Sequence, residues 1–477
     1  MNESIKLILI VERNLAGNMF GNFLPALQNI FVSENDVLLK EEQLVRLSSR
    51  IMTYLLDQYI KMYEPALLQK YQVQGYSIGK SAERSVYFLF GEITYTRTPV
   101  EKNGNIVYPI DELLGVERYS RYSLGTKYAL VSLSMVTSYR KSAELIETIA
   151  NITASKDTVM KIVHEYGEKY RNYEAYLEEY GTEGTKTVDY LYIEGDGVFI
   201  GGQDGKNKEL AHFIVHEGVE TNGNRKCTKN LKQFVGLGHR KTLNRLENYL
   251  YRTYNLKNTI IVSNADGGKG YTQTTFKSLL PSVKRHEHFL DRYHISKKLE
   301  QRVFVPELID AFQTAINQYS YESVRAALDT LESYATTQEQ EEHVKRLTSY
   351  LRRNWKIIKP YHIRDLVGEK EGIGIMESLH RILTFRMKRN SKYWGVGLES
   401  MAWLLTTKRN GTLKEIFLEK WKAAFELDDR IVLETGNHYN HFFEDEKSES
   451  GKIPTGRINF KNQTNRMHEI FKYFNGM

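Results

Sequence analysis

Two carboxylates in the segment VDYLYIEGDGVFI, Glu194 and Asp196, follow a run of apolar, strand-forming residues. Side chains two positions apart in a strand point to the same face, so both carboxylates face one side of a sheet. A second apolar run, NTIIVSNADGG, also ends in an acid followed by glycines, Asp266. Carboxylate oxygens are the ligands that Mg²⁺ prefers, and two such ions activate a water or hydroxyl for attack on a phosphodiester. These residues therefore indicate metal-dependent phosphodiester chemistry.

A third carboxylate is expected from a helix, and we select Glu377 in GIGIMESLHRILTFRMKR. The glycines before it permit close approach of the backbone, and Met376 and Leu383 supply an apolar face that can pack on the sheet. The same helix carries cations suited to DNA phosphates: Arg381, Arg386, Lys388 and Arg389. Alone, the segment also fits an amphipathic surface helix with an i,i+4 Glu–Arg pair. The three acids together favour the metal site, with Glu399 as the competing third acid.

Three further polar residues lie close to these positions in the sequence. Asp291 and His294, in LDRYH, follow another strand-like run, where they could approach a scissile phosphate or orient water. A strand-end cap and a packed histidine are the equally favoured structural interpretation. Glu194 shares a face with Asp196 and could support a metal ligand from behind.

The order of elements around the acids is typical of an RNase-H-like nuclease core. We expect a strand at Tyr190–Glu194, then strands in ELAHFIVHEGV and LKQFVGLG, a helix in KTLNRLENYLYRTYNL, and a strand in NTIIVSNADGG. The acids then follow the first and fourth strands. The later stretch from Pro306 to His362 is helical and has the character of an insertion.

The N-terminal part is predicted to be mainly helical. Two strand-like runs surround Asn103 and Gly104, a dipeptide that favours tight hairpin turns. Ser138 and Ser155 are candidate N-caps of two helices joined by NITA, which fits either a helix-turn-helix or a plain helical hairpin. In the DNA-reading version, Lys156 and Lys161 would face phosphates.

The expected fold is thus an α/β RNase-H-like catalytic core with a helical insertion, preceded by a mainly helical N-terminal DNA-binding region with a β-ribbon. We expect an N-terminal helical region at 1–75 and a β-ribbon with a helix-turn-helix-like DNA-binding region at 76–180. The first part of the core is expected at 187–300, the helical insertion at 301–368 and the core helix with the third acid at 369–410. A C-terminal region follows at 411–477.

Composition narrows the class of protein further. The 477 residues, 41% of them hydrophobic, can bury a large core, and the formal charge of +7 is compatible with a polyanionic partner. The one cysteine excludes internal disulfides and cysteine-based metal sites. The apolar run near the N-terminus is too short for a signal peptide or a membrane span. We therefore expect a cytoplasmic, nucleoid-associated protein without a membrane partner.

The chain resembles the DDE transposases of the ISLre-type bacterial insertion sequences, which are distantly similar to Mutator-type transposases. The segments that carry the resemblance, in order and spacing, are YIEGDGV, NADGG, HFLDRYHISKKL, and GIMESLHRILTFRMKR followed by YWGVGLESM. The resemblance covers most of the chain, including FGEITYTRTPV and YPIDELLG. It implies an RNase-H-like fold, a catalytic and metal-binding triad of Asp196, Asp266 and Glu377, and two Mg²⁺ or Mn²⁺ ions. The segment RNSKYWGVGLESM departs from the glycine, methionine, serine and tryptophan pattern of that family.

The resemblance implies a transposase that cleaves and transfers DNA strands. Its partners would be double-stranded DNA, as terminal inverted repeats and target DNA, and further copies of the chain, at least a dimer, because two ends must be brought together. The alternatives are a non-catalytic DNA-binding protein derived from a transposase, and an RNase-H-fold nuclease that does not join strands. Glycoside hydrolysis by paired carboxylates is disfavoured, because no tryptophan-rich stretch surrounds the acids.

Overall fold

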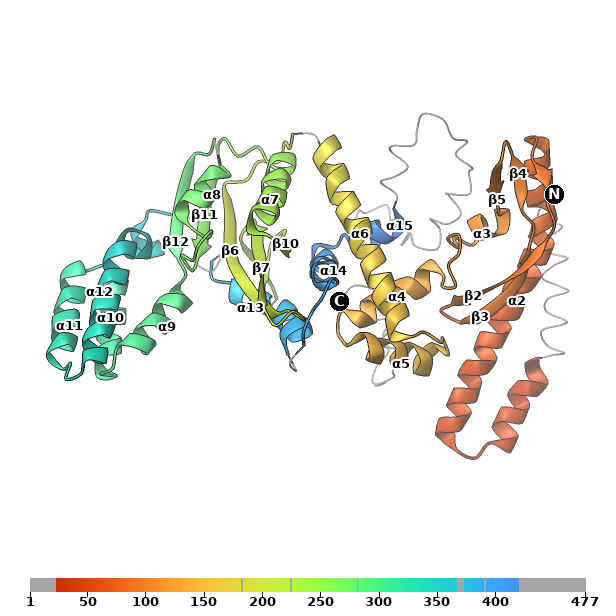
Figure 1. Cartoon of the computed structure of the whole chain (residues 1–477), viewed down its shortest axis with the longest axis horizontal. Helices are drawn as coiled ribbons and strands as arrows, with labels where there is room; N and C mark the ends of the chain where they lie inside the picture. The colour runs from red at the N-terminus through yellow and green to blue at the C-terminus, as the bar shows by residue number, and fades with distance from the viewer. Residues whose placement is uncertain are drawn as a thin grey trace. The chain divides into compact units, whose positions relative to one another are not determined.

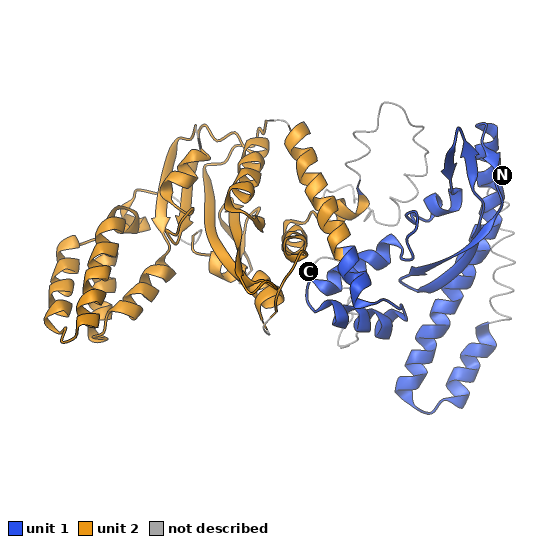
Figure 2. Cartoon of the chain, in the orientation of Figure 1, with its two compact units in different colours: residues 1–162, 419–477 blue, residues 163–418 orange. Residues whose placement is uncertain are grey.

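The computed structural model of the chain falls into two compact units (Figures 1 and 2). Unit 1 comprises Met1–Ile162 and Glu419–Met477, and unit 2 comprises Val163–Leu418. The residues that the structure describes are 23–181, 183–223, 225–280, 282–366, 373–389 and 392–419. Within these ranges, no helix is both long enough and apolar enough to cross a membrane. The helical pattern predicted before residue 23 and most of the predicted 411–477 region lie outside the described residues.

Unit 1 combines a long helix with two β-hairpins. Its first elements are a helix over 23–33, α2 (Val37–Val73), β1 (Ser77–Ile78), β2 (Ala82–Phe88), β3 (Gly91–Arg97), β4 (Val100–Lys102), β5 (Asn105–Val107) and α3 (Pro109–Leu113). The predicted turn at Asn103 and Gly104 is confirmed, since both residues have positive φ, 54° and 77°, and join β4 to β5. The run before it is more than one strand, because it folds back at Gly91 to pair β2 with β3.

Three helices complete the described part of unit 1 and lead into unit 2: α4 (Leu124–Ser134), α5 (Tyr139–Ala150) and α6 (Lys156–Tyr180). The predicted cap at Ser138 is confirmed, because its hydroxyl accepts a hydrogen bond from the Lys141 amide. The cap at Ser155 is confirmed in the same way, through the amide of Thr158. The second helix is longer than a short recognition helix, at 25 residues.

Unit 2 is organised around a five-stranded mixed sheet in the order β10-β7-β6-β11-β12. Its strands are β6 (Tyr190–Gly201), β7 (Asn207–His216), β10 (Lys232–Leu237), β11 (Ile260–Ala265) and β12 (Arg285–Leu290). The first three pair antiparallel, whereas β11 is parallel to both β6 and β12. A small hairpin of β8 (Val219–Asn222) and β9 (Arg225–Thr228) replaces the loop expected between β7 and β10.

Helices cover the sheet and bury its apolar side chains. The predicted helix is confirmed as α7 (His239–Thr253), whose Leu243, Leu246 and Leu250 are buried with α8 (Gln273–Ser278) against one face. Alternate residues of β6 point to the opposite face, where Tyr192 packs with residues of β11 and β12. On the described part of unit 2, α13 (Met376–Leu383) and the π-helical segment η3 (Thr384–Lys388) pack on β6, and α14 (Leu398–Asn410) packs on β10. The short helix α15 (Leu413–Leu418) packs on α14.

The predicted helical block is confirmed as a bundle that packs beside β12 (Figure 1). It contains α9 (Arg292–Arg302), α10 (Glu307–Asn317), α11 (Tyr321–Ser333) and α12 (Gln338–Ile358), followed by the short helix η1 (Tyr361–Ile363).

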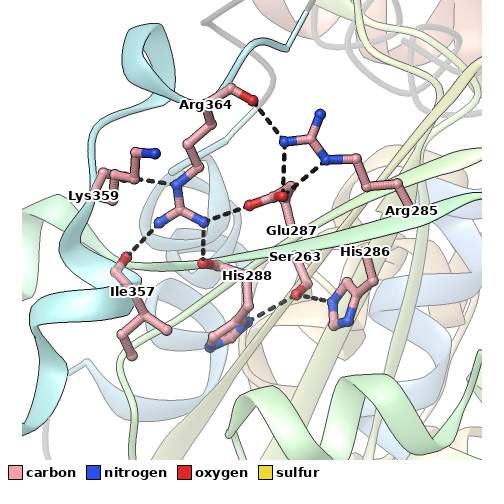
Figure 3. A network of polar contacts seen from close by, with 8 residues as sticks. All are labelled: Ser263, Arg285, His286, Glu287, His288, Ile357, Lys359 and Arg364. Carbon is pink, nitrogen blue, oxygen red and sulfur yellow. Dashed lines mark hydrogen bonds and ion pairs between the residues drawn. The ribbon is translucent and has the colours of Figure 1, made fainter.

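Arg364 fastens the end of this bundle to the sheet (Figure 3). Its buried guanidinium donates to the Glu287 carboxylate and to the carbonyl of His288 in β12, at 2.9 and 2.8 Å. It also donates to the carbonyls of Ile357 and Lys359 at the end of α12, both at 2.9 Å. One planar cation thereby joins the end of α12 to β12.

Candidate active site

Strand register places Asp196 and Asp266 beside each other. The parallel pairing of β6 with β11 matches Gly195 to Ala265, so the next residue in each chain is an aspartate. Our expectation that the first strand ends at Glu194 was wrong, since β6 continues to Gly201. The reason is β7, which pairs with β6 as far as Gly201. Asp196 therefore lies in the middle of β6, one residue beyond the end of the β11 pairing.

The glycines around Asp196 are required by close packing. A Cβ atom on Gly195 would lie 2.7 Å from the ring of Phe213, and one on Gly197 would lie 2.4 Å from the carboxylate of Glu209. Both contacts are shorter than side-chain atoms tolerate. The alternation of acids and glycines that marks this strand thus has a simple cause, because one face carries the carboxylates and the other has no room for side chains.

Backbone amides orient the two aspartates. The Gly197 amide donates to Asp196 Oδ1, and the Gly268 amide donates to Asp266 Oδ1, each at 2.7 Å. The pKa of Asp196 is raised to about 6, mainly by burial and also by the negative charges of Asp266 and Glu377, whereas the hydrogen bond from the Gly197 amide and the charge of His294 oppose the rise. The two aspartates and Glu377 therefore form a group of carboxylates whose mutual repulsion is only partly compensated.

Glu194 holds the start of the helix that carries Glu377. Its fully buried carboxylate accepts hydrogen bonds from the amides of Gly374 and Ile375, at 3.1 and 3.2 Å, just before α13. It also accepts one from Asn264 Nδ2 at 3.0 Å. Burial raises the pKa of Glu194 to about 7 despite these donors. Glu194 therefore fixes the start of α13 against β6 and β11, and its support of a metal ligand stays a prediction.

Helix α13 carries Glu377 and His380, of which His380 lies next to Asp196. Glu377 lies in the first turn with its side chain 64% exposed, and His380 is buried one turn later. His380 Nδ1 lies 3.7 Å from Asp196 Oδ2 and 4.0 Å from Glu377 Oε2. Burial, with the charge of His294, lowers the pKa of His380 to about 4, so the imidazole is neutral at pH 7. It therefore adds no positive charge to the carboxylate group.

Asp291 and His294 lie at the end of β12, at the start of α9. Their Oδ2 and Nε2 atoms are 3.8 Å apart, and Asp291 Oδ1 lies 3.5 Å from Asn264 Nδ2. Asp291 occupies the N-cap position of α9, yet its side chain makes no capping hydrogen bond. It faces the buried polar network instead, which links it through Asn264 to Glu194.

Sequence reasoning missed the positioning roles of Asn264 and His212. Asn264 is paired with Glu194 across the strands, and His212 is paired with Asp196. The ring of His212 lies 5.1 Å from that of His380, and its Nε2 contacts Gln233 Oε1 at 3.2 Å. The available signal for Asn264 was its place two residues before Asp266, which repeats the spacing of Glu194 and Asp196.

The residues predicted to contact phosphates are distributed over both units. Lys156 and Lys161 are exposed near the start of α6, in unit 1. In unit 2, exposed positions are found for Arg381, Lys388 and Arg389.

Arg386 is a correction to that set, because it is only 3% exposed and its guanidinium lies 4.9 Å from the Trp394 ring centre. The physical reason is that the helix becomes π-helical over Thr384–Lys388, which alters the face to which each side chain points. The competing acid, Glu399, is held elsewhere, because its Oε1 accepts a hydrogen bond from the Leu237 amide at 2.9 Å, at the end of β10.

The donor set suits a hard divalent cation, although the arrangement is open. Asp196, Asp266 and Glu377 offer only carboxylate oxygens, the ligands of Mg²⁺ and Mn²⁺. Among the residues that the structure describes, no three His, Cys, Asp or Glu side chains lie close enough together to hold an ion. The exposed Glu377 has the rotamer freedom to turn toward the aspartates.

Comparison with known proteins shows the family of this chain. Residues 33–463 match the uncharacterised protein family UPF0236, and the chain belongs to that family. It is 32% identical over 411 residues to the "UPF0236 protein in vanSb 3'region" of Streptococcus gallolyticus, covering 84% of this chain and 90% of that protein. It is 28% identical over 359 residues to a UPF0236 protein of Caldanaerobacter subterraneus whose name joins eleven designations, covering 72% and 73% respectively.

Proposed function

We propose that this protein is a DDE-type transposase, which binds the terminal inverted repeats of an insertion sequence and catalyses metal-dependent cleavage and transfer of DNA strands. The observation that carries the proposal is the strand register that sets Asp196 beside Asp266, with Glu377 close enough to raise the pKa of Asp196. Two adjacent aspartates at a sheet position, with the pKa of one raised by burial and by neighbouring acids, are costly to a fold and are typical of a catalytic site.

We further propose that the sheet of unit 2 is an RNase-H-like core. Support comes from the strand order, which counted along the chain is third, second, first, fourth, fifth, with three antiparallel strands followed by two parallel ones. Both β11 and β12 are followed by an acid, Asp266 and Asp291, at the same edge. Ligands of open α/β sheets bind outside the carboxyl ends of parallel strands, where these residues lie.

In this proposal Asp196, Asp266 and Glu377 hold two Mg²⁺ or Mn²⁺ ions. Bound ions would activate the attacking water or hydroxyl and stabilise the leaving oxygen. Glu194 keeps α13 in place, so that Glu377 stays within reach of the aspartates. His380 remains neutral and so leaves the negative charge of the carboxylates available to the cations.

The proposed partners are double-stranded DNA, as element ends and target, and at least one further copy of the chain. In this proposal the exposed cations Arg381, Lys388 and Arg389 in unit 2, and Lys156 and Lys161 on α6, would contact phosphates. Such a protein would act in the cytoplasm on nucleoid DNA. The relative whose name joins eleven designations in one organism is consistent with a gene present in many copies, as a mobile element would be.

A gel assay with the full chain tests this function. Labelled DNA carrying the terminal repeats of the protein's own element is incubated with Mg²⁺, Mn²⁺ or chelator, beside Asp196→Asn and Asp266→Asn. The proposal expects metal-dependent cleavage at the repeat boundary and joined products, both absent from the variants. Binding without cleavage under either metal would favour the non-catalytic DNA-binding protein, and cleavage without joining would favour the nuclease.

A further inference from the structure

A basic groove runs between α9 and α12, on the helical bundle beside the sheet. Its volume is about 380 Å³, and it is lined by Arg302, Glu342, Lys345, Arg346, Ser349, Tyr350 and Arg353. Four of the seven residues are cations and one is an acid. The cations project from two helices toward a shared space, which separates this feature from the charged face of a single helix.

The positive charge of this groove is only partly neutralised by the protein. Arg346 pairs with Glu342, and Lys345 lies 3.7 Å from Glu341, outside the groove lining. Arg353 is exposed and has no ion-pair partner among the described residues. An uncompensated cation held beside others is a ready contact for an anion.

Arg302 is the most constrained of the four cations. Its guanidinium donates to the carbonyl of Arg346 at 3.1 Å and lies 5.7 Å from the ring centre of Tyr350. Partial burial lowers its pKa, and the charges of Arg346 and Arg353 lower it further, whereas Tyr350 acts in the opposite direction. The like charges therefore repel one another, and a bound anion would relieve that repulsion.

Tyr350 links the groove to the carboxylate site. Burial raises the pKa of Tyr350 to about 12, and the negative charges of Asp266 and Asp291 contribute to that rise, whereas Arg302 and Arg353 oppose it. Helix α12 packs on both α9 and β12, the strand that ends just before Asp291 (Figure 1). The groove and the carboxylates thus belong to one contiguous part of unit 2.

Helix α9 connects the two features along the chain. It begins directly after Asp291, at the sheet edge where Asp266 also lies, and Arg302 of the groove is its last residue.

From this geometry we propose that the groove binds the sugar–phosphate backbone of the duplex DNA whose bond reacts at the carboxylates. The proposal rests on the function proposed above and deepens it, because it assigns the helical bundle a direct part in holding the substrate. Contact is with phosphates, so binding at the groove does not depend on base sequence. Ser349 and the hydroxyl of Tyr350 add neutral donors that can complete the contacts.

Neutralising single cations tests the proposal by binding alone. Fluorescence anisotropy of a labelled 30-base-pair duplex of arbitrary sequence is measured with the full chain in chelator, across a range of salt concentrations. The variants are Arg302→Gln and Arg353→Gln, and the matched control is Arg325→Gln, an exposed arginine of α11 that does not line the groove. An equal-length RNA duplex is measured in parallel.

Each groove variant is expected to lose about fivefold in affinity at 0.15 M salt and to reduce the slope of log affinity against log salt by about 0.9, while the control matches wild type. If the groove variants bind DNA with the same affinity and the same salt slope as wild type, the groove proposal is overturned and the proposed function stands. If wild type binds no duplex DNA, both proposals fall together. Stronger binding of the RNA duplex would also overturn the assignment to DNA.

Discussion

Replacing Asp196 with asparagine should stabilise the metal-free protein. The Asp196 side chain is 20% exposed, and its pKa is raised from 3.8 to about 6, mainly by burial and then by its acidic neighbours. That rise corresponds to about 3 kcal/mol by which the ionised carboxylate destabilises the folded state at neutral pH. Asparagine removes the charge but keeps an oxygen that can accept the hydrogen bond from the Gly197 amide. We therefore expect Asp196→Asn to raise the free energy of unfolding by about 2–3 kcal/mol at pH 8.

The pH dependence of this gain has a definite sign. The folded state takes up a proton on Asp196 near pH 6, whereas the unfolded chain does so only near 3.8. Wild type therefore gains stability as the pH falls from about 7 to about 4, and Asp196→Asn lacks that gain. The advantage of the variant is full at pH 8 and disappears near pH 4.

Thermal unfolding in chelator at several pH values is the assay. For a unit of this size, 2–3 kcal/mol corresponds to roughly 5–10 °C in Tm. Asp189→Asn is the matched control, because Asp189 is exposed just before the same strand, and it should leave Tm unchanged. A lower Tm of Asp196→Asn at pH 8, or an advantage over the control that is the same at pH 5 as at pH 8, would show that the Asp196 carboxylate does not destabilise the folded state.

Three further outcomes follow from the same structure. Burial lowers the pKa of His288 to about 3, so below pH 6.5 the unfolded state binds a proton that the folded state does not. Between pH 6.5 and pH 5, the free energy of unfolding measured in urea should therefore fall by about 2 kcal/mol more for wild type than for His288→Gln. Equal decreases in the two proteins would contradict this. Arg364→Ala leaves Glu287 without its buried partner, so it should lower the free energy of unfolding in urea by about 3 kcal/mol, with Arg364→Lys intermediate. A decrease below about 1 kcal/mol would show that Arg364 does not hold the helical bundle on the sheet. Glu377→Gln changes an exposed side chain, so its free energy of unfolding should stay within about 0.5 kcal/mol of the wild-type value, while DNA cleavage is lost. Retained cleavage would show that Glu377 is not part of the catalytic site.

Much of the fold could be predicted because local patterns determine it. The leucine spacing of α7, the caps at Ser138 and Ser155, and the Asn103–Gly104 turn each rest on interactions within a few residues. The extension of β6 past Glu194 could not be read from its own residues. It depends on pairing with β7, and glycines weaken the strand signal where the packing demands them.

The same distinction applies to the candidate site. The spacing of Glu194, Asp196 and Asp266 identified residues that the strand register brings together. The hydrogen bonds from the α13 amides to Glu194 join residues 180 and 181 positions apart, and no local pattern encodes them. Burial of Arg386 was missed for another reason, since a π-helical turn changes the helical phase on which the assignment of faces depends.

The central claim is that Asp196, Asp266 and Glu377 form one metal-binding catalytic site. The most direct test is Mn²⁺ binding to the full chain, followed by electron paramagnetic resonance with and without element-end DNA. Wild type is compared with Asp196→Asn, Asp266→Asn, Glu377→Gln and the Asp189→Asn control. We expect Mn²⁺ to bind to wild type and to the control, and its binding to be weakened or lost in each of the three site variants. Undiminished binding in all three variants, or no binding by wild type even with DNA, would contradict it.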